Sequence, residues 1–191
     1  MQLIAKHYNE PDAETALLQV LTKVISEAHI EPVFLCIGSD RHILDCFGPL
    51  TGSMILEQVP EARIFGSLRH PLHARNLNQR LFEIRREYPG GYEIAIDASL
   101  GRIEEMGMIK LREGPLHPGL AVARQLPSAG RLSITAVVGT TRDKRKITQQ
   151  YGSIEPVYYL ACLLSSVIVS WYRQRGVFDA DNPKILDYRE P

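Results

Sequence analysis

The sequence has few of the features that mark secreted, membrane-bound or nucleic-acid-binding proteins. Its three cysteines, Cys36, Cys46 and Cys162, are an odd set without a CxxC pair, which argues against a disulfide framework. Lysine plus arginine number 22 and aspartate plus glutamate also 22, so no excess charge favours nucleic acid or an anionic membrane. The first residues lack a basic flank before a long apolar core, and we therefore expect a cytoplasmic protein.

Long hydrophobic runs are also missing. The most apolar stretch, residues 157–172, is interrupted by three serines and falls short of the about 20 residues that cross a bilayer. Glu155 and Pro156 suit the first turn of a helix, and Arg173 and Gly176 suit its end. This stretch therefore predicts a buried helix and not a membrane span, with one broad face against the body of the protein.

Short apolar runs alternate with amphipathic stretches along the chain. Strands are predicted near 32–38, 62–68, 92–98, 106–114 and 131–139, and helices near 12–28, 45–57, 73–88 and 156–173. The runs 33–37, 93–97 and 132–138 are apolar without strict alternation, which is typical of interior strands in a parallel sheet. The pattern predicts an α/β protein, a three-layer α/β/α sandwich with a mostly parallel central sheet.

The length of 191 residues fits one domain. We expect a single α/β domain over residues 1–191. Within it, residues 1–30 are expected to form an N-terminal helical extension, and residues 177–191 a polar C-terminal tail.

Two aspartates follow predicted strands. Gly38 ends the first strand, and Pro49 fits only the first turn of a helix, which puts Asp45 at or near the N-cap. Asp97 ends the strand "YEIAID". Because sites in open α/β sheets form beyond the carboxyl ends of the strands, carboxylates on neighbouring strands would face one crevice, where they could divide acid and base roles. Taken singly, Asp45 is equally well explained as a helix cap and Asp97 as a turn former.

Asp40 and Arg41 come directly after this first strand and belong to the rim of the same crevice. The guanidinium of Arg41 could orient a carboxylate or a peptide carbonyl through its fork of donors. The alternative is an exposed ion pair of little energetic value.

Three motifs carry a family resemblance. In order, "IGSDRHILDCFGPLTG", "AIDASLG" and "EGPLHPGLAVARQLPSAGRLSITAVV" resemble the YyaC-type sporulation proteins, which are similar to the germination protease that degrades small acid-soluble spore proteins. The resemblance extends from about Val33 to about Arg173. It implies a phosphorylase/hydrolase-like fold, similar also to hydrogenase-maturation endopeptidases, and a location in the spore or forespore. The two aspartates assigned to catalysis in the germination protease are matched by Asp45 of "DCFGP" and Asp97 of "IDA".

The motifs and the resemblance together predict an aspartate-dependent, peptidase-like hydrolase with a protein or peptide substrate. Asp45 and Asp97 would be catalytic, and Asp40, Arg41 and His117 of "GPLHPG" would bind the substrate. We expect no resident metal or other cofactor, no nucleic acid and no membrane partner, while the sequence is compatible with a homo-oligomer.

Two alternatives stay open at this point. The first is a noncatalytic sporulation factor that binds a peptide in the same crevice. The second is metal-dependent binding of a partner, because the resemblance to hydrogenase-maturation endopeptidases implies nickel held by two acids and a histidine.

Overall fold

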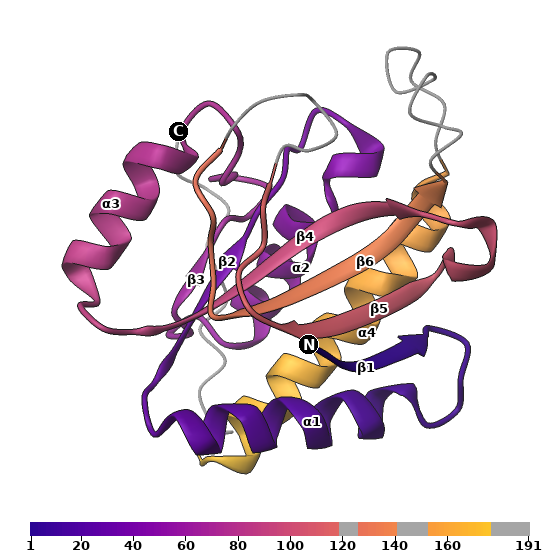
Figure 1. Cartoon of the computed structure of the whole chain (residues 1–191), viewed down its shortest axis with the longest axis horizontal. Helices are drawn as coiled ribbons and strands as arrows, with labels where there is room; N and C mark the ends of the chain where they lie inside the picture. Colours follow the sequence, from indigo (N-terminus) through magenta and orange to yellow (C-terminus); the bar gives the residue numbers. More distant parts are fainter. Residues whose placement is uncertain (119–125, 141–152, 177–191) are drawn as a thin grey trace.

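The protein is built on a mixed sheet with the strand order β1-β5-β6-β4-β2-β3 (Figure 1). The computed structural model describes residues 1–118, 126–140 and 153–176. The strands are β1 (Gln2–His7), β2 (Pro32–Cys36), β3 (Ile64–Phe65), β4 (Tyr92–Gly101), β5 (Met108–Glu113) and β6 (Leu132–Thr140). Strands β6, β4, β2 and β3 run parallel, whereas β5 is antiparallel to β6 and to β1. The predicted mostly parallel sheet is confirmed, and β2, β4 and β6 are interior strands as expected.

Helices cover both faces of this sheet. They are α1 (Ala13–Ala28), α2 (Phe47–Gln58), α3 (Leu77–Glu87) and α4 (Ile154–Gln174), with the short 3₁₀ helices η1 (Ile43–Asp45) and η2 (Ile103–Glu105). Buried residues of α1, α2 and α4 share one apolar cluster with one face of the sheet. Leu77, Leu81 and Ile84 of α3 belong to a second cluster on the other face. The three-layer α/β/α arrangement is therefore confirmed.

The first residues of the chain form a strand that the sequence analysis did not predict. We expected a helical extension over residues 1–30, but residues 2–7 form β1 and pair with β5 at the edge of the sheet. Helix α1 is not an appendage either, because Leu17 and Leu21 are fully buried in the core. A short edge strand gives little local signal, since its partner lies about a hundred residues away in the sequence. The tail predicted at 177–191 lies outside the described residues.

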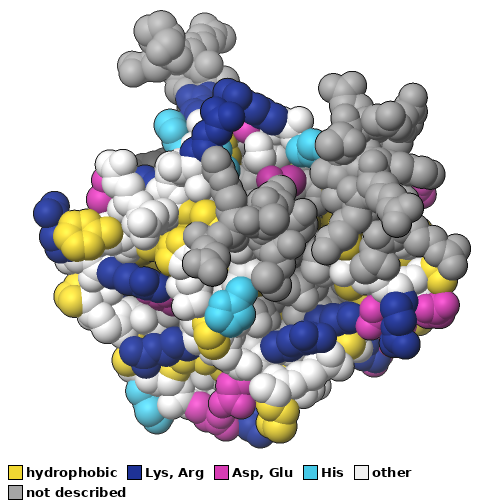
Figure 2. All heavy atoms as spheres, turned by 45° about the horizontal axis from the view of Figure 1, so that its top comes forward, with side chains coloured by type: hydrophobic (Ala, Val, Ile, Leu, Met, Phe, Trp, Pro, Cys, Tyr) yellow, Lys and Arg dark blue, Asp and Glu magenta, His cyan; other side chains and the backbone are white. Residues whose placement is uncertain are grey.

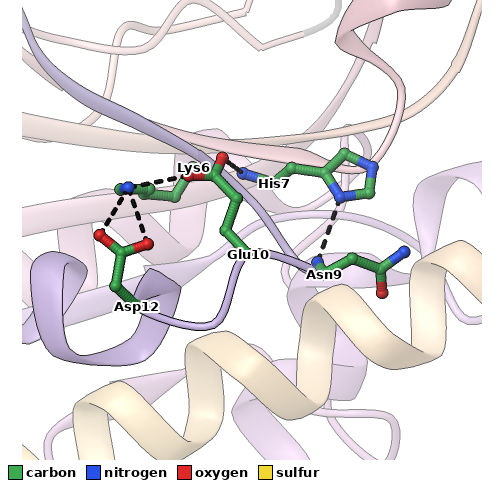
Figure 3. A network of polar contacts seen from close by, with 5 residues as sticks. All are labelled: Lys6, His7, Asn9, Glu10 and Asp12. Carbon is green, nitrogen blue, oxygen red and sulfur yellow. Dashed lines mark hydrogen bonds and ion pairs between the residues drawn. The ribbon is translucent and has the colours of Figure 1, made fainter.

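A polar network fixes the turn between β1 and α1 (Figure 3). The Nζ of Lys6 donates to Glu10 Oε2 at 2.8 Å and to the two carboxylate oxygens of Asp12 at 2.9 and 2.8 Å. Glu10 Oε1 accepts the backbone N–H of His7 at 2.8 Å, and His7 Nδ1 accepts that of Asn9 at 3.1 Å. The His7 amide and the Lys6 ammonium lower the pKa of Glu10. The network ties the edge strand to the start of α1.

Helix α4 is the apolar helix that the sequence predicted near 156–173. Among the described residues it is the one helix long and apolar enough to cross a membrane, yet half of its most apolar window is buried inside the protein. It contacts both α1 and α2, and Leu160, Val167 and Trp171 are buried. Trp171 packs edge-on against Phe34 of β2, with 6.4 Å between ring centroids. The prediction of a buried core helix is confirmed.

Candidate functional site

The candidate site lies where the connections of two neighbouring parallel strands leave in opposite directions. From β2 the chain runs through α2 to β3 on one side, and from β4 it runs to β5 and β6 on the other. Such a topological switch point leaves a crevice at the carboxyl ends of the strands. The Ile37 N–H donates to the Ile96 carbonyl at 2.7 Å, beyond which β4 continues paired with β6 alone. Asp97 is therefore the first residue of β4 past the end of β2.

Two glycines bring the start of α2 against the end of β2. Gly38 has a φ of +144°, which residues with a side chain rarely adopt, and a β-carbon there would overlap the carbonyl oxygen of Asp45. A β-carbon at Gly48 would likewise overlap the carbonyl oxygen of Ile37. The Ser39 N–H donates to the Asp45 carbonyl at 2.9 Å and closes the loop between them. The loop after β2 thus returns Asp45 to the end of that strand.

Asp45 is the last residue of η1 and does not cap α2. The N-cap of α2 is Cys46, and no side-chain hydrogen bond caps this helix end, so the helix-cap explanation of Asp45 is wrong. Although the residue as a whole is exposed, protein atoms crowd its carboxyl group, and this desolvation raises the pKa of Asp45 to about 6. The imidazoles of His42 and His73, followed by the Ser39 amide, act in the opposite direction.

Asp97 is half-buried within β4, where it lies opposite Thr135 of β6. It therefore sits inside a strand, and the explanation as a turn former is wrong. Burial raises the pKa of Asp97 well above its ordinary value, and the charge of Asp45 raises it further. The Ala98 N–H, which donates to Asp97 Oδ1 at 2.8 Å, opposes these effects only in part. Repulsion of this kind requires carboxyl groups that are close in space, so the two aspartates converge on one crevice.

The two carboxyl groups hold their protons with unequal strength. Desolvation is the main cause of both shifts, but Asp97 bears the additional repulsion from Asp45. Two neighbouring acids that cannot both ionise easily are suited to a division of labour, in which one is a base and the other an acid.

The predicted binding residues are less closely associated with the pair. Asp40 and Arg41 are exposed on the loop after β2, and neither forms an ion pair with another described residue. The backbone N–H of Arg41 donates to Ser39 Oγ at 3.2 Å. His117 is exposed as well, and within the described part of the chain the histidines that influence the pKa of Asp45 are His42 and His73, not His117. Figure 2 shows histidine, basic and acidic side chains side by side on the face that the top of Figure 1 presents.

The sequence analysis missed His42 and His73. Each stands in a loop without a motif of the resemblance that gives it a role, and only the folded chain brings both near Asp45. A local signal for His73 existed in "HPLHARNL", where an asparagine three residues after the histidine precedes a helix.

No group of three or more histidine, cysteine, aspartate or glutamate side chains suited to a metal ion occurs in residues 1–118, 126–140 and 153–176. In these residues the crevice offers two carboxyl groups and nearby imidazoles without the convergence that a metal site requires.

The fold and the crevice define an α/β protein with two aspartates at the switch point of its sheet. Residues 5–167 match the family described as "Protein of unknown function (DUF1256)", and the chain belongs to this family. It is also 32% identical over 142 residues to a protein of Bacillus subtilis (strain 168) named "Uncharacterized protein YyaC", a match that covers 72% of this chain and 69% of that protein. The predicted membership in a YyaC-type family is confirmed, whereas the relation to the germination protease stays a prediction.

Proposed function

We propose that this protein is a peptidase-like hydrolase that uses Asp45 and Asp97 and acts on a protein substrate during sporulation. The observation that carries the proposal is the mutual electrostatic influence of these two carboxyl groups at the switch point, with both pKa values raised. Sporulation and a protein substrate in the spore or forespore are supported by the resemblance of the motifs to the YyaC-type sporulation proteins and, through them, to the germination protease.

The two aspartates take different roles in this proposal. With a pKa of about 6, Asp45 is mostly ionised at neutral pH and removes a proton from a water molecule, whose oxygen attacks the scissile carbonyl carbon. Asp97 remains protonated because of its burial and its charged neighbour, and it gives its proton to the leaving nitrogen as the C–N bond breaks. Transfer of the proton from Asp45 to Asp97 then restores the starting state.

A specific dependence on pH follows from these roles. The rate of cleavage should rise as the pH passes about 6, where Asp45 loses its proton, and should fall again at the higher pH where Asp97 ionises. A bell-shaped profile of kcat/KM against pH is the expected form.

The rim of the crevice would bind the substrate. The exposed guanidinium of Arg41 is available to a peptide carbonyl or carboxylate, because it forms no ion pair with another described residue. Asp40 beside it and His117 on the loop after β5 complete the proposed binding set, both assigned from their positions in the motifs.

Incubation of the purified protein with extracted spore proteins tests the proposal. The wild type should produce defined fragments, whereas Asp97→Asn and Asp45→Asn should produce none, with circular dichroism spectra that match the wild type. Cleavage that persists in either folded variant would remove the mechanism.

The same experiment separates the alternatives. Stable binding of a spore protein by the wild type without any fragments would favour a noncatalytic binding factor. Stoichiometric nickel in protein purified without chelator, together with partner binding that chelator abolishes, would favour the metal-dependent alternative.

A further inference from the structure

The segment before α3 closes the crevice on the side of β3. Leu72 forms a parallel bridge with Ile37, and its carbonyl accepts the N–H of Gly38 at 2.9 Å. His73 is the next residue, and Gly38 is in turn packed against the backbone of Asp45. His73 and Asp45 therefore flank the same glycine from two different loops.

Asn76 holds the backbone of His73 in place. Its Oδ1 accepts the N–H of His73 at 2.9 Å, and its Nδ2 donates to the Pro71 carbonyl at 3.0 Å. The His73 carbonyl accepts the N–H groups of Asn76 and Leu77 at 3.0 and 2.9 Å. Because Leu77 is fully buried in the core, these bonds fix His73 relative to α3.

The imidazole of His73 has a polar atom that nothing else in the described protein uses. Its Nδ1 is shielded from solvent and has no hydrogen-bond partner among the described residues. Leaving a buried polar group unsatisfied costs about 1–3 kcal/mol, and such exceptions in native proteins call for an explanation. Asp45 is affected by this ring, since His73 lowers the pKa of the carboxyl group.

We infer that His73 is a positioning residue of this site, whose imidazole faces the Asp45 carboxylate and keeps that carboxylate, rather than Asp97, in the ionised form. The groups that face Asp45 are Asp97 from β4, His42 and Cys46 from its own segment, and His73 from the loop before α3. Burial favours the protonated form of Asp45, whereas the two histidines favour the ionised form. His73 thereby decides which aspartate is the base, a consequence that rests on the proposed function.

A ¹³C titration of the aspartate carboxyl groups in the full chain tests this inference without any substrate. The Asp45 signal is identified by its loss in Asp45→Asn. In His73→Gln the titration midpoint of Asp45 should rise by about half a pH unit or more, because an opposite charge nearby is lost. The matched control is His70→Gln, since His70 is exposed on the same loop and is not among the groups that shift Asp45. An unchanged midpoint in folded His73→Gln would overturn the inference.

A second measurement covers the case in which His73→Gln does not fold. In a crystal structure of the wild type, Nδ1 of His73 should reach the Asp45 carboxylate directly or through one water molecule. A ring turned away from Asp45 would overturn the inference equally.

Failure of the inference and failure of the proposed function are distinguishable. If the wild type cleaves no protein but His73→Gln moves the Asp45 midpoint, the inference stands and the peptidase proposal falls. If cleavage depends on both aspartates but the midpoint stays in place, the inference alone falls. If both hold, the acidic limb of the kcat profile should move to higher pH in His73→Gln and stay in place in His70→Gln.

Discussion

At the scale of single residues, the crevice is a place where the protein gives up stability. Asp45 and Asp97 are both desolvated more than they are compensated, so each carboxyl group binds its proton more tightly in the folded protein than in the unfolded chain. A residue retained at such a cost is usually retained for its chemistry.

Asp45→Asn should therefore stabilise the protein at neutral pH. The folded-state pKa of about 6 lies above the ordinary value of 3.8, so the wild type loses stability as the pH rises from 3.8 through 6. The uncharged variant avoids this loss, which is roughly 1 kcal/mol after discounting for the exposure of the residue. Thermal unfolding should give a higher Tm for the variant at pH 7 and equal Tm values at pH 3. A lower Tm for the variant at pH 7 would contradict the account.

Single residues also differ in how far the sequence alone could predict their place. Asp45 and Asp97 were predicted because each follows an apolar strand, a relation that is local in the sequence. His73 was not predicted as a neighbour of Asp45, because that proximity depends on the pairing of Leu72 with Ile37, which no local pattern encodes.

At the scale of elements, the site depends on how closely α2 approaches β2. The sequence indicated that a helix follows the glycine-proline pair, but it could not indicate that a helical glycine would contact the strand directly. Gly48 is in contact with the backbone of Ile37, and Gly52, one turn further, is in contact with the backbone of Gly66. This approach sets the position of Asp45 at the start of the helix.

Gly48→Ala should destabilise the protein although alanine favours helices by about 1 kcal/mol over glycine. The added β-carbon would overlap the Ile37 carbonyl oxygen, and such overpacking typically costs 1–3 kcal/mol. Urea unfolding should show a net loss of about 1–2 kcal/mol, and the ¹³C midpoint of Asp45 should change as the helix shifts. Asn78→Ala, at an exposed position of α3, is the control and should leave both unchanged. Wild-type stability in Gly48→Ala would show that the helix has room to move.

The attachment of α4 depends on aromatic contacts with the middle of the sheet. Phe34 of β2 is fully buried and lies against Trp171 and Tyr172, with ring centroids 6.4 and 6.3 Å apart. Phe34→Ala should lower the free energy of unfolding by about 3–5 kcal/mol, as expected for a phenylalanine removed from a core. Chemical unfolding followed by Trp171 fluorescence measures the loss, and a change below 1 kcal/mol would refute the central place of this contact.

At the scale of the whole molecule, the interior of the fold was predictable and its margin was not. The strands β2, β4 and β6 are buried on both faces, so their apolar runs identify them without any knowledge of the fold. The edge strand β1 and the antiparallel direction of β5 depend on pairings between distant segments. The direction of β5 matters for the site, because the route from β4 to β6 by way of β5 sets one side of the switch point.

The central claim is that Asp45 and Asp97 share one crevice and titrate as a pair. The most direct test is the ¹³C titration of Asp97 in the wild type and in Asp45→Asn. Because the charge of Asp45 raises the pKa of Asp97, the midpoint of Asp97 should fall in the variant, and it should remain above the ordinary value of 3.8 because burial persists. A midpoint of Asp97 that is the same in both folded proteins would show that the two carboxyl groups do not meet.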